Sequence, residues 1–229
     1  MMFDPATDVV TRYKSSFKHR FAKHGVHNKI IDILLQNHSS SILDVGCARG
    51  YLGEELLKKN NTAQLCGIEY DASAAEIAKK FYSQIWIGKV EDVIDRIPPK
   101  QFDAIVCADV LEHTPRPDVV LMMLRKVIKD DGILVTSIPN IVYAPVRVKV
   151  LFGKFDYEEA GHLDKTHLRF FTIDTAIKMV EESGFSTIKV IRTGLGSLVP
   201  VFPTWLSTHA LIIAGTRKNT DLKHVLGTG

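Results

Sequence analysis

A short apolar run that ends in a glycine-rich turn constrains the fold of this chain more than any other feature. Residues 41–53 read SILDVGCARGYLG, and a helical pattern follows the turn at once. A buried parallel strand that passes into a helix whose N-terminus faces a ligand has this form. Glycine at positions 46 and 50 removes Cβ atoms where a bulky ligand would press against the backbone.

The spacing of these glycines differs from the dinucleotide-binding fingerprint. That fingerprint requires G-x-G-x-x-G, whereas Ala48 occupies the middle position here and weakens a nicotinamide interpretation. The turn resembles instead the first motif of class I S-adenosylmethionine-dependent methyltransferases. The resemblance implies S-adenosylmethionine as the cofactor and S-adenosylhomocysteine as its product. It places the cofactor against Asp44, Gly46, Cys47, Ala48 and Gly50, where Asp44 either accepts from the ligand or braces the loop.

Apolar runs and amphipathic segments alternate from residue 41 onward. We expect strands at 41–45, 64–69, 84–87, 102–107 and 132–138, with helices at about 50–60, 72–82, 91–96 and 116–130. A helix at 172–184 and β-rich runs at 186–193 and 207–216 follow. Strands that are apolar on both faces indicate a parallel sheet covered by helices. The expected fold is a Rossmann-like, doubly wound α/β sheet of seven strands. By resemblance it is mostly parallel, with one antiparallel edge strand.

The length of 229 residues favours one main domain. We expect an N-terminal helical cap or lid over 1–40, a catalytic domain over 41–217 and a disordered tail over 218–229. The three cysteines form no C-x-x-C pair, which indicates reduced thiols in a cytoplasmic protein. No segment resembles a signal peptide or a membrane span. The sequence does not indicate the oligomeric state.

An acidic residue closes the second expected strand, about twenty residues after the glycine turn. Glu69 could accept hydrogen bonds from both hydroxyls of a ribose, as acids do at this place in dinucleotide folds. Tyr70 would then lie beside the adenine, or pack on the surface. The alternative for Glu69 is a charge near a helix N-terminus, a role that Asp71 fills better.

The segment after the third strand departs from the pattern of the resembled family. Related methyltransferases commonly have an Asp where Lys89 stands, and lysine cannot accept a hydrogen bond from the adenine amino group. We expect the backbone of Val90 to contact the adenine edge instead, with Glu91 as a substitute acceptor.

The fourth strand leads into the segment ADVLEH at residues 108–113. It resembles the D-V-L-E-H segment of small-molecule methyltransferases, including the ubiquinone-biosynthesis O-methyltransferase group. The resemblance implies that the backbone of Ala108 and Asp109 meets the methionine end of the cofactor. His113 could take part in the chemistry or order the loop before Pro115. The Asn/Asp-Pro-Pro-Tyr/Phe segment of nucleic-acid base amino-methyltransferases does not occur here.

The segment from about residue 139 to residue 171 should form a roof over the acceptor, beyond the carboxyl ends of the strands. The segment DKTHLRFFT at 164–172 resembles a bacterial methyltransferase-domain family associated with surface-glycan and secondary-metabolite pathways. Three interpretations of its side chains stay open. His162, Asp164 and His167 could hold a metal, although their spacing matches no strict signature and we predict no metal. His167 or His162 could be a general base oriented by Asp164. All three could be structural.

Three further residues of the roof are candidate contacts to the acceptor. Arg169 could bind a carboxylate or phosphate of the substrate with two hydrogen bonds, or pair with a nearby acid. Tyr157 and Asn140 lie in the same region and are assigned with it to acceptor binding.

These patterns together predict an S-adenosylmethionine-dependent methyltransferase that acts on an oxygen of a small polar acceptor, such as a sugar, a glycan precursor or a secondary metabolite. One rival is an RNA or other nucleic-acid methyltransferase that uses the basic segment 12–29 to contact phosphates. The other is a non-catalytic protein that binds S-adenosylmethionine. The net charge of +3 does not by itself indicate a nucleic-acid partner.

Overall fold

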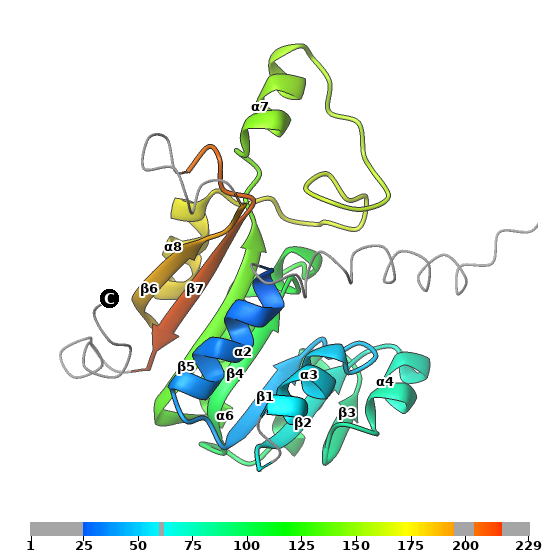
Figure 1. Ribbon diagram of the computed structural model, residues 1–229, viewed down its shortest axis with the longest axis vertical. Coiled ribbons are helices and arrows are strands. Elements are labelled where there is room, and N and C mark those ends of the chain that lie inside the picture. Colours follow the sequence, from blue (N-terminus) through cyan, green and yellow to red (C-terminus); the bar gives the residue numbers. More distant parts are fainter. Residues whose placement is uncertain (1–24, 60–61, 195–203, 217–229) are drawn as a thin grey trace, which may run out of the picture.

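The computed structural model describes residues 25–59, 62–194 and 204–216, and Figure 1 shows one twisted sheet at its centre. The seven strands are β1 (Ser41–Val45), β2 (Gln64–Glu69), β3 (Gln84–Ile87), β4 (Phe102–Ala108), β5 (Ile128–Pro139), β6 (Ser186–Arg192) and β7 (His209–Gly215). Their order in the sheet is β3-β2-β1-β4-β5-β7-β6. Strand β7 runs antiparallel to both β5 and β6, whereas the other pairs are parallel. The predicted fold class is confirmed, with β6 as the outer strand beside the reversed β7.

Helices cover both faces of the sheet. They are α2 (Val26–Gln36), α3 (Tyr51–Lys59), α4 (Ala72–Ala78), α5 (Val90–Val93), α6 (Pro117–Val127), α7 (Ala144–Leu151) and α8 (Ile173–Glu182), with 3-10 turns η1 (Ile94–Arg96) and η2 (Leu111–His113). One apolar core lies between the sheet and helices α2, α3 and α4. The other lies under α5, α6 and α8. The chain is therefore a three-layer α/β sandwich, as expected for a doubly wound sheet.

Strand β7 shows why the strands read as continuous apolar runs. Side chains alternate between the two faces of a strand, and here each face carries a helical layer. Ala210 and Ile212 belong to the core under α5, α6 and α8, while Leu211 and Ile213 belong to the opposite core. All four residues are buried. A strand that is buried on both faces has apolar residues at every position and no polar residues between them. Such a run indicates a strand, but it does not indicate which strands lie beside it in the sheet.

The largest differences from the predicted elements lie between α6 and β5 and at the end of α4, which stops at Ala78 instead of residue 82. The predicted helix at 116–130 ends at Val127, and β5 begins at Ile128 rather than at residue 132. Ile128 is already extended and pairs with Phe102 at the start of β4. Lys129 then bonds Asp103. Pairing with β4 thus overrides the helical pattern of this segment.

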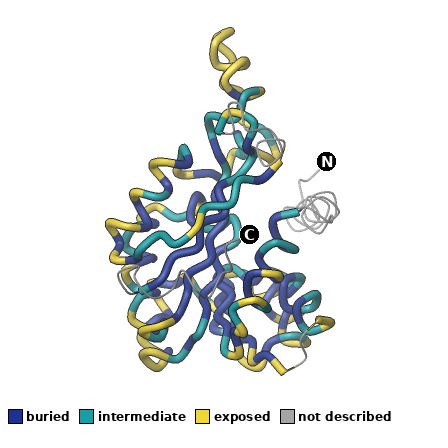
Figure 2. The backbone as a smooth tube through the Cα atoms, turned by 60° about the vertical axis from the view of Figure 1, so that its left-hand side comes forward, coloured by how far each residue is buried: buried dark blue, intermediate teal, exposed yellow. Residues whose placement is uncertain are grey.

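The predicted roof contains one short helix, α7, which projects beyond the sheet and is largely exposed (Figures 1 and 2). In Figure 2 the strands form the buried centre of the molecule. Residues 1–24 of the predicted cap and the predicted tail at 218–229 lie outside the described residues. Within the described ranges, no helix is long and apolar enough to cross a membrane.

Candidate functional site

The glycine turn after β1 has a left-handed backbone, and protein side chains fill the space where the sequence predicted a ligand beside its glycines. Gly46 and Gly50 have φ of +70° and +83°, and Ala48 between them has φ of +48°. A Cβ at position 46 would lie 2.7 Å from Cγ2 of Val110, which is too close for any side chain. The amides of Gly46 and Cys47 donate to the carbonyl of Ile68 in β2. The turn therefore packs tightly against the ends of β2 and β4.

Glu69 at the end of β2 joins the glycine turn to the next loop. Its Oε2 accepts from the amide of Ala48 at 2.7 Å, and its Oε1 accepts from the amide of Asp71 at 2.9 Å. The residue is 4% exposed, and its burial raises the pKa of the carboxyl. A carboxylate has about four acceptor positions, so two backbone donors leave room for hydroxyl donors of a ligand. Tyr70 beside it is 77% exposed and free to lie against a planar ring.

Asp44 lies beneath the turn and braces it. The hydroxyl of Tyr82 donates to Asp44 Oδ2 and accepts from the amide of Gly53 at the start of α3. Burial is the main reason why the pKa of Asp44 rises to about 7. Of the two roles considered for Asp44, this geometry favours bracing of the loop. Tyr82 was not among the predicted site residues, because nothing in its local pattern indicates a partner 38 residues away.

The turn after β3 leads directly into the short helix α5. Lys89 precedes the helix without a side-chain cap, and Val90 is its first residue. The amide of a first helical residue has no partner within the helix, so Val90 presents a backbone donor at this end of the sheet. Both Lys89 and Glu91 are exposed.

The end of β4 carries a strained acidic residue. Asp109 has φ of +53°, which is uncommon outside glycine and is typical of functional sites. Its amide donates to Ser137 in β5, and the Ser137 hydroxyl donates to Asp109 Oδ1 at 2.6 Å. Ala108 precedes it as the last residue of the strand. These contacts hold Asp109 at the carboxyl edge of the sheet.

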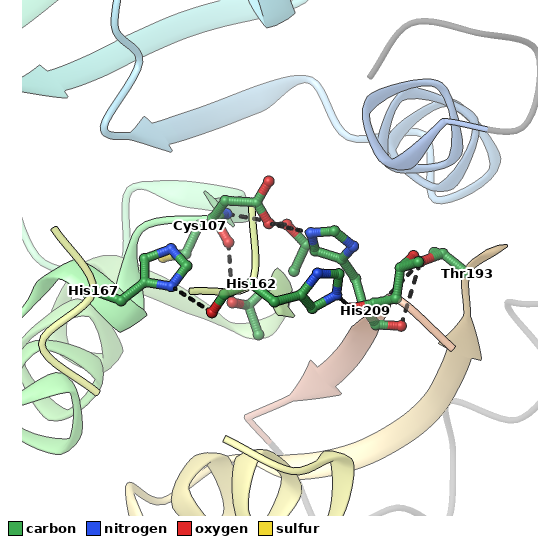
Figure 3. Close-up of polar contacts among 9 residues, drawn as sticks. Cys107, His162, His167, Thr193 and His209 are labelled. Carbon is green, nitrogen blue, oxygen red and sulfur yellow. Dashed lines mark hydrogen bonds and ion pairs between the residues drawn. The ribbon is translucent and has the colours of Figure 1, made fainter. Parts of the chain in front are cut away.

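Three histidines gather at this edge, two from the roof loop and one from the start of β7 (Figure 3). His162 Nε2 donates to the carbonyl of Thr208 at 2.9 Å, and its ring stacks on Tyr143 with centroids 5.0 Å apart. His167 Nδ1 donates to the carbonyl of His162 at 3.3 Å. His209, the first residue of β7, lies with its ring centroid 5.7 Å from that of His162. Burial is the largest cause that lowers the pKa of both His162 and His167, which favours their neutral forms.

The hydrogen bonds that two of these histidines make to backbone carbonyl groups identify their tautomers. A carbonyl only accepts, so Nε2 of His162 and Nδ1 of His167 carry a proton. In the neutral ring the other nitrogen is then an acceptor. Nδ1 of His162 and Nε2 of His167 are therefore the atoms that could take a proton from a ligand.

His113 belongs to a different group from the trio that was considered as a possible metal site. Its ring centroid lies 4.8 Å from that of His167, and Glu112 completes a group whose ligand atoms lie within 4.8 Å of one another. Such a group could hold a cation. Asp164 instead accepts from the amide and hydroxyl of Thr166 within its own loop. Among the described residues, the trio of His162, Asp164 and His167, considered as one possible metal site, is therefore not the set that the fold brings together.

The candidate acceptor contacts differ in their surroundings. Asn140 is buried, and its Nδ2 donates to the carbonyls of Thr204 and Ser207, so its amide holds the chain before β7. Arg169 donates from Nε and Nη2 to the carbonyl of Pro115. Tyr157 is exposed, and its ring contacts that of Phe155.

A cavity of about 130 Å³ lies between α7 and the roof loop. Its lining includes Tyr143, Val146, His162 and Leu163. A larger hollow of about 340 Å³, lined by residues such as Met122 and Arg125, lies on α6 and α8. We take the smaller cavity as the one relevant to the site, because it contains a histidine of the cluster.

Comparisons with known proteins found similar sequences and folds. A family model described as a methyltransferase domain matches residues 15–190. The ubiquinone biosynthesis O-methyltransferase of Histophilus somni is 28% identical over 123 residues, covering 50% of this chain and 51% of that protein. The mitochondrial ubiquinone biosynthesis O-methyltransferase of Schizosaccharomyces pombe is 32% identical over 102 residues, covering 42% and 36%. The matches thus span about half the length of these relatives, or less.

Solved structures share the fold over nearly the whole described chain. A methyltransferase of Thermotoga maritima, described as a possible histamine N-methyltransferase, has a TM-score of 0.67 at 17% identity and covers 91% of this chain and 96% of its own. The 1,6-didemethyltoxoflavin N1-methyltransferase of Burkholderia thailandensis was solved with S-adenosylhomocysteine. It has a TM-score of 0.60 at 13% identity, with coverage of 95% and 92%.

Proposed function

This chain belongs to the methyltransferase-domain family, and on that premise we propose that it transfers the methyl group of S-adenosylmethionine to an oxygen of a small polar acceptor. A sugar, a glycan precursor or a secondary metabolite fits the polar, histidine-rich roof. The names of the curated relatives, which are O-methyltransferases, support oxygen as the acceptor atom.

The proposal rests on one observation. Glu69 and the histidine cluster lie at the same edge of the sheet, since β2, β4 and the reversed β7 all bring residues to it. A cofactor held by its ribose at Glu69 would extend along this edge toward Asp109 and the histidines. Open α/β sheets bind ligands at this edge, beyond the carboxyl ends of their strands.

The residues of the glycine turn fit S-adenosylmethionine. Glu69 offers acceptor positions for hydroxyl donors beside its hydrogen bond from the amide of Ala48. The space left by the missing Cβ of Gly46 is filled by Val110, so this glycine acts on the shape of the turn. We propose that Glu69 holds the ribose hydroxyls, that Tyr70 and Val90 contact the adenine with Glu91 as a further acceptor, and that Ala108 and Asp109 contact the methionine end. Asp44, Gly46, Cys47 and Gly50 shape the turn around it.

When bound, S-adenosylmethionine supplies an electrophilic methyl group on a positively charged sulfur. The protein must align the acceptor with that group and exclude water, which can lower the barrier by about 7–11 kcal/mol. A hydroxyl acceptor must also lose its proton. Nδ1 of His162 and Nε2 of His167 are candidate proton acceptors, with Asp164 and His113 ordering the loop around them. Arg169 and Tyr157 are candidate acceptor contacts, and Asn140 positions the chain next to them.

A transfer assay tests this function. The protein is incubated with S-adenosylmethionine tritiated at the methyl group and with four probes: catechol, methyl glucoside, benzylamine and benzoate. We expect label in the hydroxyl probes and loss of that label in Glu69→Ala. Label confined to benzylamine would overturn oxygen as the acceptor atom. Binding of S-adenosylmethionine without transfer to any probe would favour the non-catalytic alternative.

A further inference from the structure

His209 lies beside Asp109 because one strand of the sheet is reversed. Strand β7 runs antiparallel to β5, with His209 in register with Pro139. Its first residue therefore reaches the edge at which β4 and β5 end. There His209 Nε2 lies 3.8 Å from Asp109 Oδ1. This separation is longer than a hydrogen bond and short enough for an ion pair once the imidazole is protonated.

The pair is built into the fold and still reaches the surface of the site. The side chain of Asp109 is 7% exposed and that of His209 is 24% exposed. The Nδ1 atom of His209 is buried, so Nε2 is the nitrogen on the side of the carboxylate and the candidate to reach a ligand. The amide of His209 donates to Thr193 Oγ1 at 3.1 Å, and its carbonyl accepts from the amide of Thr193. Both the amide and the carbonyl of His209 are thus hydrogen-bonded to Thr193, which fixes its backbone (Figure 3).

The other imidazoles of the cluster have different partners. His162 and His167 each donate from one ring nitrogen to a backbone carbonyl. His209 instead has a carboxylate beside Nε2, and a carboxylate stabilises the imidazolium that forms when a histidine takes a proton. His162 is the other titratable ring that faces His209, at 5.7 Å between centroids. A second cation there would oppose protonation, so a neutral His162 favours the role of His209.

We propose that His209 is the catalytic base of the methyl transfer and that Asp109 is the residue that stabilises its protonated form. The inference rests on the proposed transfer to a hydroxyl. The acceptor O–H bond breaks and its proton goes to His209 Nε2, while the oxygen forms a bond to the methyl carbon. The carbon–sulfur bond breaks, and its electron pair stays on sulfur. The proton then leaves His209 for water, so the net products are the methyl ether, S-adenosylhomocysteine and one proton.

The ion pair can be tested without any acceptor. The protein is labelled at its histidine rings, and the His209 resonance is assigned by its absence in His209→Gln. Its chemical shift is then followed against pH in the wild type and in Asp109→Asn, which keeps the acceptor for the Ser137 hydroxyl. We expect the titration midpoint of His209 to fall by about one pH unit in Asp109→Asn. A midpoint that moves by less than about 0.2 unit, a small fraction of the shift expected for a charge this close, would overturn the role of Asp109.

Kinetics with the best hydroxyl probe test the base itself. We expect His209→Gln to lower kcat by about 10²–10⁴-fold while the affinity for S-adenosylmethionine, measured by calorimetry, changes by less than about threefold, since an interaction made only in the transition state leaves binding intact. The matched control is His38→Asn, an exposed histidine with φ of +50° just before β1, at the opposite edge of the sheet. It should keep the wild-type kcat.

The outcomes separate this inference from the proposed function. A wild type that methylates hydroxyl probes, together with a His209→Gln variant of unchanged kcat and pH profile, would overturn His209 as the base and leave O-methylation standing. A wild type that methylates no hydroxyl probe would overturn the proposed function and the catalytic role with it. In the productive case, the rate should rise with pH in the wild type, and this rise should be absent from the residual rate of His209→Gln.

Discussion

The hydroxyl of Tyr82 donates a hydrogen bond of 2.5 Å to the buried carboxyl of Asp44. The same hydroxyl accepts from the amide of Gly53 at 3.1 Å. Tyr82 thus connects the last part of β1 to the first turn of α3, on either side of the glycine turn. Because this turn is the proposed cofactor site, a contact outside it controls its shape.

Removal of the Tyr82 hydroxyl should destabilise the protein and the turn together. Tyr82→Phe leaves the Asp44 carboxyl without this donor and the Gly53 amide without this acceptor, both in buried surroundings. We expect a loss of about 1–3 kcal/mol in the free energy of unfolding, measured by urea denaturation. Tyr157→Phe, at an exposed tyrosine, should change it by less than about 0.5 kcal/mol. Equal stabilities for the two variants would contradict the bracing role.

The raised pKa of Asp44 predicts that ionisation of this group opposes folding. Its pKa is about 7 in the folded state, against about 3.9 in an unfolded chain. Between these values the folded state binds more protons, so stability falls as pH rises. Asp44→Asn cannot ionise. From pH 5 to pH 8, its stability relative to the wild type should therefore increase by roughly 2–3 kcal/mol.

Urea denaturation of both proteins at several pH values gives this difference. Glu69 also has a raised pKa and acts in the same direction, but it is present in both proteins and is largely removed by the comparison. A difference that stays constant between pH 5 and pH 8 would show that Asp44 is already ionised throughout the range.

The ribose role of Glu69 predicts a loss of cofactor affinity. Glu69→Gln keeps the size of the side chain but removes the charge and one of the two acceptor oxygens. Hydrogen bonds to charged groups contribute about 1.5–3 kcal/mol, so the Kd for S-adenosylmethionine should rise by roughly 10–100-fold. Calorimetry should show the same loss for S-adenosylhomocysteine, which shares the ribose. Glu76→Gln, at an exposed acid on α4, serves as the control.

Substitution of two glycines with nearly the same φ can distinguish the cost of a left-handed backbone from the cost of a steric clash. Gly46 and Gly153 have φ of +70° and +72°, but a Cβ would meet Val110 at position 46 and no atom within 4 Å at position 153. Both substitutions to Ala should cost about 1–2 kcal/mol for the left-handed backbone. Gly46→Ala should cost a further 1–3 kcal/mol or so for overpacking and should weaken cofactor binding. If both variants had the same free energy of unfolding and the same affinity for S-adenosylmethionine, a clash with Val110 at position 46 would be ruled out.

The sequence was sufficient to predict the elements whose information is local. The strands β1 to β4 were predicted to within about one residue, because each is a short, mainly apolar run bounded by turn residues. This holds even for the edge strand β3, which is partly exposed. The glycine turn and Glu69 were predicted for a related reason. A left-handed turn requires glycine at fixed positions, and an acid at the end of the next strand lies one crossover away.

The partners of the site residues were decided by the tertiary structure alone. Tyr82 reaches Asp44, Asn140 bonds the carbonyls of Thr204 and Ser207, and His209 meets Asp109, all across 38 to 100 residues of chain. The apolar pattern of β7 predicts a strand but gives neither its direction nor its place between β5 and β6. That order depends on how both faces of the whole sheet are packed, and it alone brings a histidine from the end of the chain to the proposed active site.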